Sequence, residues 1–151
     1  LDCSGLTSLI YKIFGHMIPR DANDQFIYSK KIKKISELKL GDLIFSTKEN
    51  SDFVDHVMLY SGDENIIEAT KDCNCVREIA FSQKFGIDLK DAISGKQING
   101  KKIYFGRFID DQIVKDEKKS DQKNLNNTTM KKKVTNKTYK KTSNKNKRGK
   151  K

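Results

Sequence analysis

Three side chains of this sequence have the chemistry of a nucleophile, its base and a group that orients the base: Cys3, His56 and Glu68. Cysteine reacts as a thiolate, and a helix N-terminus or a nearby imidazolium lowers the pKa of a thiol. The chain contains three cysteines and two histidines, so few Cys–His pairs can form. Because Cys3 opens an amphipathic segment, its position indicates covalent catalysis by a thiolate as the reaction class.

The position of Cys3 distinguishes it from a core cysteine. Cysteine is often buried and inert, which is the alternative interpretation here. Cys3, however, precedes the apolar stripe of the segment, and its neighbours Asp2 and Ser4 do not belong in a core. A thiol at this point would face the free N–H groups of a helix start, which favour the thiolate and can donate to an oxyanion.

His56 is the better candidate for the base because it lies in an apolar, strand-like run that would hold it rigidly. The alternative interpretation of His56 is a hydrogen-bonded core histidine. His16 is the weaker candidate for the base, because it follows Gly15 at a predicted helix end, where a histidine can serve as a cation near the helix C-terminus. Glu68 lies on the returning strand of a predicted hairpin, where cross-strand neighbours are about 5 Å apart. Its carboxylate could therefore fix the imidazole tautomer; a solvent-facing glutamate is the alternative.

Two helices and five strands must position these groups. Apolar residues at three- and four-residue spacing predict a helix over 4–14, and a second helix is expected over 22–28. The expected strands are 43–45, 53–60, 66–69, 76–81 and 103–109, with a hairpin turn at 62–65 and a polar loop, with room for one helical turn, over 82–102. Helices followed by antiparallel strands predict an α+β domain.

The formal net charge of +11 is confined to the end of the chain. Residues 115–151 hold 15 of the 31 basic and 3 of the 20 acidic residues, which leaves the rest near neutral. This Lys- and Asn-rich stretch cannot bury enough apolar surface to fold, so we predict a disordered tail. The alternative interpretation is that the tail has a function and binds anionic polymers. No base-reading or aromatic stacking motif favours sequence-specific nucleic-acid binding, and no apolar run has the length of a transmembrane segment.

Cys73 and Cys75 form a C-x-C pair that is too close for a zinc knuckle, and no second Cys/His pair follows. We expect ordinary thiols in a loop or at a strand edge, with metal binding or redox chemistry as the alternative.

Five short motifs follow one another along the chain: 2–6 (Asp-Cys-Ser-Gly-Leu), 19–25 (Pro-Arg-Asp-Ala-Asn-Asp-Gln), 40–45 (Leu-Gly-Asp-Leu-Ile-Phe), 55–62 (Asp-His-Val-Met-Leu-Tyr-Ser-Gly) and 66–69 (Ile-Ile-Glu-Ala). In this order and spacing the chain resembles the NlpC/p-sixty family of papain-like cysteine peptidases, which cut bacterial peptidoglycan. The resemblance implies a papain-like fold, with N-terminal helices packed on a small antiparallel sheet. It divides the chain into a peptidase domain over 1–112, lacking the N-terminal segment usual in the family, and the tail over 113–151.

The resemblance also implies roles for individual residues. Cys3 would be the nucleophile, His56 the general base and Glu68 the orienting group. Asp2, Ser4, Arg20 and Gln25 match motif positions expected at the substrate site, with Asp2 and Ser4 meeting the free amine of a stem peptide. The implied substrate is the D-γ-glutamyl–diamino-acid bond of peptidoglycan. The resemblance implies that no metal or organic cofactor is needed for this cleavage. It also implies that the protein acts in the bacterial cell envelope or outside the cell.

Two other functions stay open at this stage. One is an amidase or acyltransferase of the same fold that acts on another amide or ester. The other is a non-catalytic binding protein in which the basic tail dominates.

Overall fold

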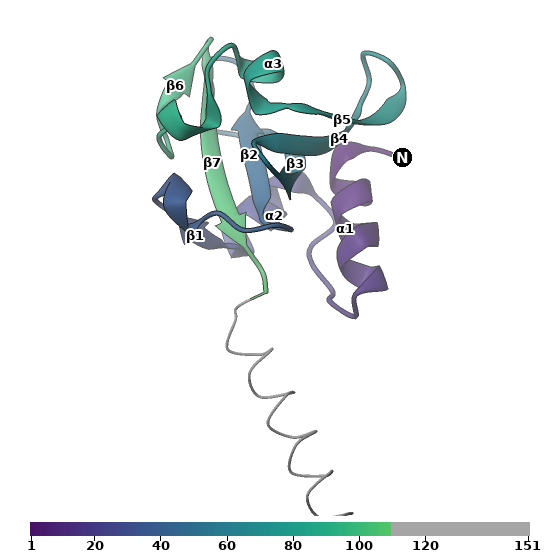
Figure 1. Ribbon diagram of the computed structural model, residues 1–151. Helices are drawn as coiled ribbons and strands as arrows, with labels where there is room; N and C mark the ends of the chain where they lie inside the picture. The colour runs from purple at the N-terminus through teal and green to yellow at the C-terminus, as the bar shows by residue number, and fades with distance from the viewer. Residues whose placement is uncertain (110–151) are drawn as a thin grey trace, which may run out of the picture. The chain divides into compact units, whose positions relative to one another are not determined.

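Helices come first in the chain and antiparallel strands follow, which confirms the predicted α+β class (Figure 1). The computed structural model describes residues 1–109, and the predicted tail over 113–151 lies outside this range. The helices are α1 (Cys3–Ile13), α2 (Ala22–Tyr28) and α3 (Phe81–Phe85), with short 3-10 turns η1 (Ile35–Glu37) and η2 (Leu89–Asp91). The strands are β1 (Lys30–Ile32), β2 (Leu43–Thr47), β3 (Val54–Gly62), β4 (Asn65–Thr70), β5 (Cys75–Ala80), β6 (Gln97–Ile98) and β7 (Lys101–Arg107).

Helix α1 begins at Cys3 because Asp2 caps it. Asp2 has extended backbone angles, and its carboxylate accepts a hydrogen bond of 2.7 Å from the N–H of Gly5. An aspartate in this position satisfies one of the free donors of the first turn. The cap therefore places the thiol in the first turn of the helix, one residue earlier than the apolar periodicity predicts.

The sheet is antiparallel throughout and has the strand order β1-β7-β2-β3-β4-β5, with β6 paired to β7. Strand β2 lies in the interior of this order, and all five of its residues are buried. The β3–β4 hairpin turns through Asp63 and Glu64, which both have positive φ angles. Two consecutive residues with positive φ angles make a two-residue turn whose twist matches the right-handed twist of the paired strands.

The two faces of the sheet meet different partners. On one face, α1 and α2 pack against β3, and Phe26 of α2 contacts Phe45 of β2 with ring centroids 5.6 Å apart. On the other face, α3 and η2 supply Phe81, Phe85 and Leu89 to a core built on the sheet residues Ile44, Met58, Ile66, Ile103 and Phe105. Because strand side chains alternate between faces, His56 and Glu68 share the second face with Met58 and Ile66.

Two short strands were not expected from the sequence. Strand β1 lies between the second predicted helix and the first predicted strand, and it forms because Ile32 is buried opposite Phe105 of β7. Strand β6 lies in the stretch predicted as a loop, and helix α3, which begins one residue before that stretch, is the helical turn for which the loop had room. Asn99 and Gly100, both with positive φ, make the turn between β6 and β7, and Asn-Gly is a hairpin signal that the sequence does contain.

A buried ion pair links the end of β7 to the start of β2. The guanidinium of Arg107 at the end of β7 donates to both carboxylate oxygens of Asp42, at 2.7 and 2.6 Å, just before β2 begins. Asp42 is 3% exposed, so this bidentate pair compensates a buried charge and fixes the start of β2. Among the helices of residues 1–109, none combines the length and the apolar character that a membrane crossing needs.

Candidate active site

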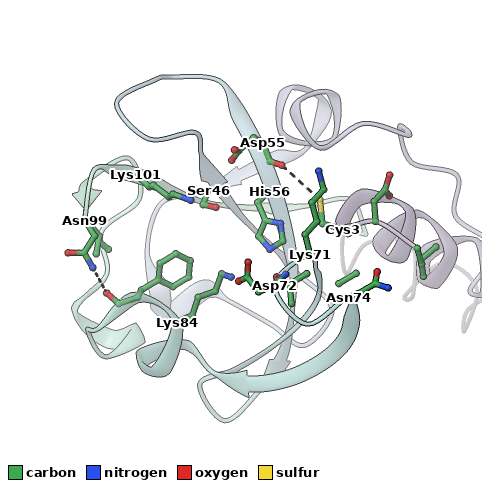
Figure 2. A pocket seen from close by; sticks show the side chains of 16 residues that line it. Cys3, Ser46, Asp55, His56, Lys71, Asp72, Asn74, Lys84, Asn99 and Lys101 are labelled. Carbon is green, nitrogen blue, oxygen red and sulfur yellow. Dashed lines mark hydrogen bonds between the residues drawn. The ribbon is translucent and has the colours of Figure 1, made fainter.

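A cavity of about 640 Å³ opens between the start of α1, strand β3 and the segment from β4 to α3 (Figure 2). Its walls include Cys3 from α1, Asp55 and His56 from β3, and Lys84 from α3. The loop between β4 and β5 closes one side with Lys71, Asp72 and Asn74. The cavity therefore contains the one free thiol within residues 1–109 and places it beside an imidazole.

His56 and Glu68 form a short contact across the β3–β4 hairpin. The imidazole Nε2 lies 2.7 Å from Oε2 of Glu68. The side chain of His56 is 20% exposed and that of Glu68 is fully buried. A carboxylate on one ring nitrogen fixes the tautomer and the ring orientation, which leaves Nδ1 as the nitrogen that can exchange a proton with the thiol.

Glu68 has two further partners that the sequence did not indicate. Arg77 stands directly opposite Glu68 in the β4–β5 ladder and donates to Oε1 from Nε and Nη2, at 3.1 and 2.8 Å. Lys84 donates to Oε2 from Nζ at 2.6 Å. Burial would raise the pKa of Glu68, but the hydrogen bonds from His56, Lys84 and Arg77 outweigh it and lower the pKa to about 2. Glu68 is therefore a carboxylate at every pH where the protein would act.

The thiol and the imidazole have pKa values shifted toward each other. Burial would raise the pKa of Cys3, but its interaction with His56 and the nearby backbone N–H groups lower it overall. Burial would lower the pKa of His56, but the thiol and Glu68 raise it overall. The two shifts favour a thiolate–imidazolium pair, which is the reactive form of a cysteine nucleophile.

Asp2, Ser4 and Arg20 form a polar cluster next to Cys3. Nη2 of Arg20 lies 2.7 Å from Oδ2 of Asp2, and Nη1 donates to Oγ of Ser4 at 3.0 Å. Asp2 lines the cavity and its side chain is 52% exposed. Ser4, expected outside the core, is buried at 6% exposure because its side chain accepts from Arg20 and its carbonyl lies under α2.

Gln25 supports helix α1 through hydrogen bonds. It is fully buried, and its amide nitrogen donates to the carbonyls of Ser4 and Pro19, at 3.1 and 2.8 Å, and to Ser8 Oγ at 3.0 Å. Its amide oxygen accepts from Thr7 at 2.8 Å. All four partners are protein groups, so Gln25 ties α2 to the first turns of α1 and does not face the cavity. Gln25 thus supports the helix that carries Cys3, and its expected role at the substrate site stays a prediction.

The expectation of free thiols at Cys73 and Cys75 is wrong. These residues form a disulfide across Asn74, with Cα atoms 5.1 Å apart, in the loop that lines the cavity. Asn74 between them has a positive φ of 50°, a conformation that asparagine tolerates better than most residues. Within residues 1–109, no group of three or more His, Cys, Asp or Glu side chains could hold a metal ion.

Comparison with known proteins gives a family match over most of the chain. The model of the NlpC/P60 (p-sixty) family matches residues 1–145. A relative from Bacillus subtilis named gamma-D-glutamyl-L-lysine dipeptidyl-peptidase is 38% identical over 71 residues, which is 46% of this chain and 24% of that protein. The chain spans between 21% and 36% of the length of the curated relatives it matches.

Solved structures share the fold. An NlpC/P60 family protein from Bacillus cereus superposes with a TM-score of 0.56 at 30% identity, over 73% of this chain and 32% of the other. RipD from Mycobacterium tuberculosis, described as a non-catalytic NlpC/p60 domain protein, superposes with a TM-score of 0.52 at 22% identity, over 72% of this chain and 67% of the other. The predicted arrangement of helices on an antiparallel sheet is thus confirmed as the fold of this family.

The paired shifts of Cys3 and His56 predict the pH dependence of alkylation. Iodoacetamide should modify Cys3 below the pH range of an ordinary thiol, because the thiolate forms at lower pH when His56 is protonated beside it. His56→Ala should slow the reaction at pH 6 and 7 and leave it unchanged at pH 10, where the thiol ionises without help. His16→Ala is the matched control and should follow the wild-type profile; a His56→Ala profile identical to wild type would contradict the pairing.

The burial of the Glu68 carboxylate predicts how the free energy of unfolding depends on pH. Glu68 has a folded-state pKa below its unfolded value, so its contribution is present above the unfolded value and is lost as the pH falls toward about 2. The difference in unfolding free energy between wild type and Glu68→Gln should shrink by roughly 2 kcal/mol from pH 6 to pH 3. Urea titrations at several pH values measure it, with the exposed Glu49→Gln as control. A difference that is constant with pH would mean that Glu68 is not held as a carboxylate.

Proposed function

This chain belongs to the NlpC/P60 family, and on that premise we propose that it is a cysteine peptidase that hydrolyses amide bonds in the stem peptides of peptidoglycan. The observation that supports this most is that Cys3 and His56 line one open cavity and that the fully buried Glu68 lies behind the imidazole. We propose the D-γ-glutamyl–diamino-acid bond as the bond cleaved. The name of the Bacillus subtilis relative, a gamma-D-glutamyl-L-lysine dipeptidyl-peptidase, is in keeping with this choice.

Acylation begins from the thiolate–imidazolium pair. The Cys3 thiolate attacks the carbonyl carbon of the scissile amide, and the carbonyl π electrons move to oxygen to give a tetrahedral oxyanion. The backbone N–H of Cys3 lies in the first turn of α1, where N–H groups have no acceptor within the helix, and in this proposal it donates to that oxyanion. His56 gives its proton to the departing amine nitrogen, the C–N bond breaks, and a thioester on Cys3 is left.

Deacylation reverses the proton path. Neutral His56 removes a proton from water, and the resulting hydroxide attacks the thioester carbonyl. The C–S bond breaks, the carboxylic acid product leaves, and the thiolate–imidazolium pair is restored. Glu68 keeps its charge throughout and acts on the imidazole, whose Nε2 it holds at 2.7 Å.

The cluster of Asp2, Ser4 and Arg20 supplies the substrate anchor in this proposal. The hydrogen bonds from Arg20 and from the Gly5 N–H lower the pKa of Asp2, so its half-exposed carboxylate is ionised at the cavity wall. A carboxylate beside the nucleophile favours a substrate with a free amine, such as the N-terminal amine of a trimmed stem peptide. Arg20 holds Asp2 and also donates to the buried Ser4, so Ser4 acts on the substrate through Arg20 and Asp2.

The proposed substrate sets the proposed location. Peptidoglycan lies outside the bacterial cytoplasmic membrane, so we place this protein in the cell envelope or in the surrounding medium. Binding of anionic wall polymers by residues 113–151 is compatible with this location and remains a sequence-based expectation.

Two alternative functions make different predictions. An amidase or acyltransferase of the same fold would use Cys3 but release a different product, which mass spectrometry of the products identifies. A non-catalytic binding protein would lose its function when residues 115–151 are deleted, and its Cys3 would not react with an electrophile at neutral pH. RipD, described as adapted to peptidoglycan binding, illustrates this second possibility within the fold.

Replacing the nucleophile tests the proposal. Cys3→Ala should lower the turnover of defined muropeptides by at least about a thousandfold, the scale seen when a covalent catalyst loses its nucleophile. The variant should keep the wild-type circular dichroism spectrum, because α1 is capped by Asp2 and braced by Gln25. Liquid chromatography with mass spectrometry measures the products, and Lys12→Ala, at an exposed position of the same helix, is the control. Undiminished turnover by Cys3→Ala would end the proposal.

A further inference from the structure

One oxygen of Glu68 is shared by two residues. Oε2 lies 2.7 Å from Nε2 of His56 and 2.6 Å from Nζ of Lys84, whereas Oε1 is occupied by Arg77 alone. Figure 2 shows Lys84 extending toward His56 from the side of the cavity opposite to Cys3. The lysine and the imidazole therefore share one carboxylate oxygen as their acceptor.

The fold holds Lys84 in this position. Lys84 belongs to α3, which is anchored in the core by Phe81 and Phe85, at 0% and 6% exposure. The side chain of Lys84 is 19% exposed, so water screens its charge only in part.

The charges around Glu68 exceed its own. Arg77 and Lys84 already supply two fixed positive charges to one carboxylate, before His56 gains its proton. A like charge near a titrating group disfavours the charged form of that group. If Arg77 were the only other cation beside Glu68, the carboxylate would stabilise the imidazolium strongly. The positive charge of Lys84 opposes this stabilisation.

We propose that Lys84 is a positioning residue which, by sharing Oε2 of Glu68 with His56, weakens the stabilisation that the carboxylate at Nε2 gives to the imidazolium. The charge of Lys84 lowers the pKa of His56, in opposition to the raising effect of Glu68 and the thiol. The consequence for catalysis rests on the proposed function: an imidazolium held less tightly gives its proton to a leaving amine more readily.

Several other charged groups also face His56 and must be kept constant. Cys3 reaches it from α1, Glu68 from β4 and, through Glu68, Arg77 from β5. Asp55 precedes it on β3, and Lys71 and Asp72 line the same cavity from the β4–β5 loop. A variant at Lys84 leaves all of these unchanged, so the effect of its charge can be isolated.

The test is the titration of His56 by NMR, which needs no turnover. A chain with Cys3→Ala and His16→Gln leaves one histidine and removes the coupled thiol. In this background Lys84→Gln should raise the midpoint of the His56 titration by about half a pH unit or more, because a like charge near the imidazolium is removed. Lys84→Arg should keep the midpoint of the parent chain, and Lys90→Gln, on the exposed surface after α3, should leave it unchanged.

The outcomes separate this proposal from the proposed function. A midpoint that is unchanged or lower in a folded Lys84→Gln chain would overturn the role of Lys84, whether or not the protein is a peptidase. If neither Lys84→Gln nor Lys84→Met folds, Lys84 is a structural requirement and the tuning role is also overturned. If the midpoint rises while the Cys3-containing protein cleaves no muropeptide, the role of Lys84 stands and the proposed function fails.

Discussion

The interaction on which the rest of the structure depends is the burial of one ionised carboxylate. Glu68 has no exposed side-chain surface, and a charge in that position is tolerated only when its oxygens are fully paired. The partners come from three different elements: His56 from β3, Arg77 from β5 and Lys84 from α3. Satisfying one buried charge therefore fixes the hairpin, the edge strand and a short helix relative to one another, and it orients the imidazole in the same step.

A second constraint brings the thiol to that imidazole. Asp2 determines where α1 begins, Arg20 holds Asp2, and Gln25 binds the carbonyl of Ser4 in the first turn. These contacts connect α1 to the segment that leads into α2, so the N-terminus of α1 cannot shift without losing several hydrogen bonds. The first constraint orients the base and the second places the nucleophile, and the two meet where Cys3 interacts with His56.

The sequence predicted the elements whose signals are local. Helix α2 has the predicted bounds, and α1 and strands β2 to β5 match within a few residues, because apolar periodicity and turn residues are properties of short segments. Strand β1 could not be found in this way, since its three residues pair with β7 at the other end of the domain. The pairing of Glu68 with His56 was accessible because a hairpin brings fixed positions together. Lys84 carried no signal, because its approach to Glu68 depends on how α3 packs on the sheet. The disulfide between Cys73 and Cys75 was missed because a C-x-C pair can also remain reduced.

In the proposed function, Cys3 forms a covalent acyl intermediate during the cleavage of a stem peptide. Intact-protein mass spectrometry after acid quench, in the first turnovers with a γ-D-glutamyl–diamino-acid substrate, tests this directly. We expect a transient mass increase equal to the acyl portion, located on Cys3 by peptide mapping and absent after Cys3 has been alkylated. Product release that proceeds at the same rate from the alkylated protein, with no adduct on Cys3 at any time, would contradict it.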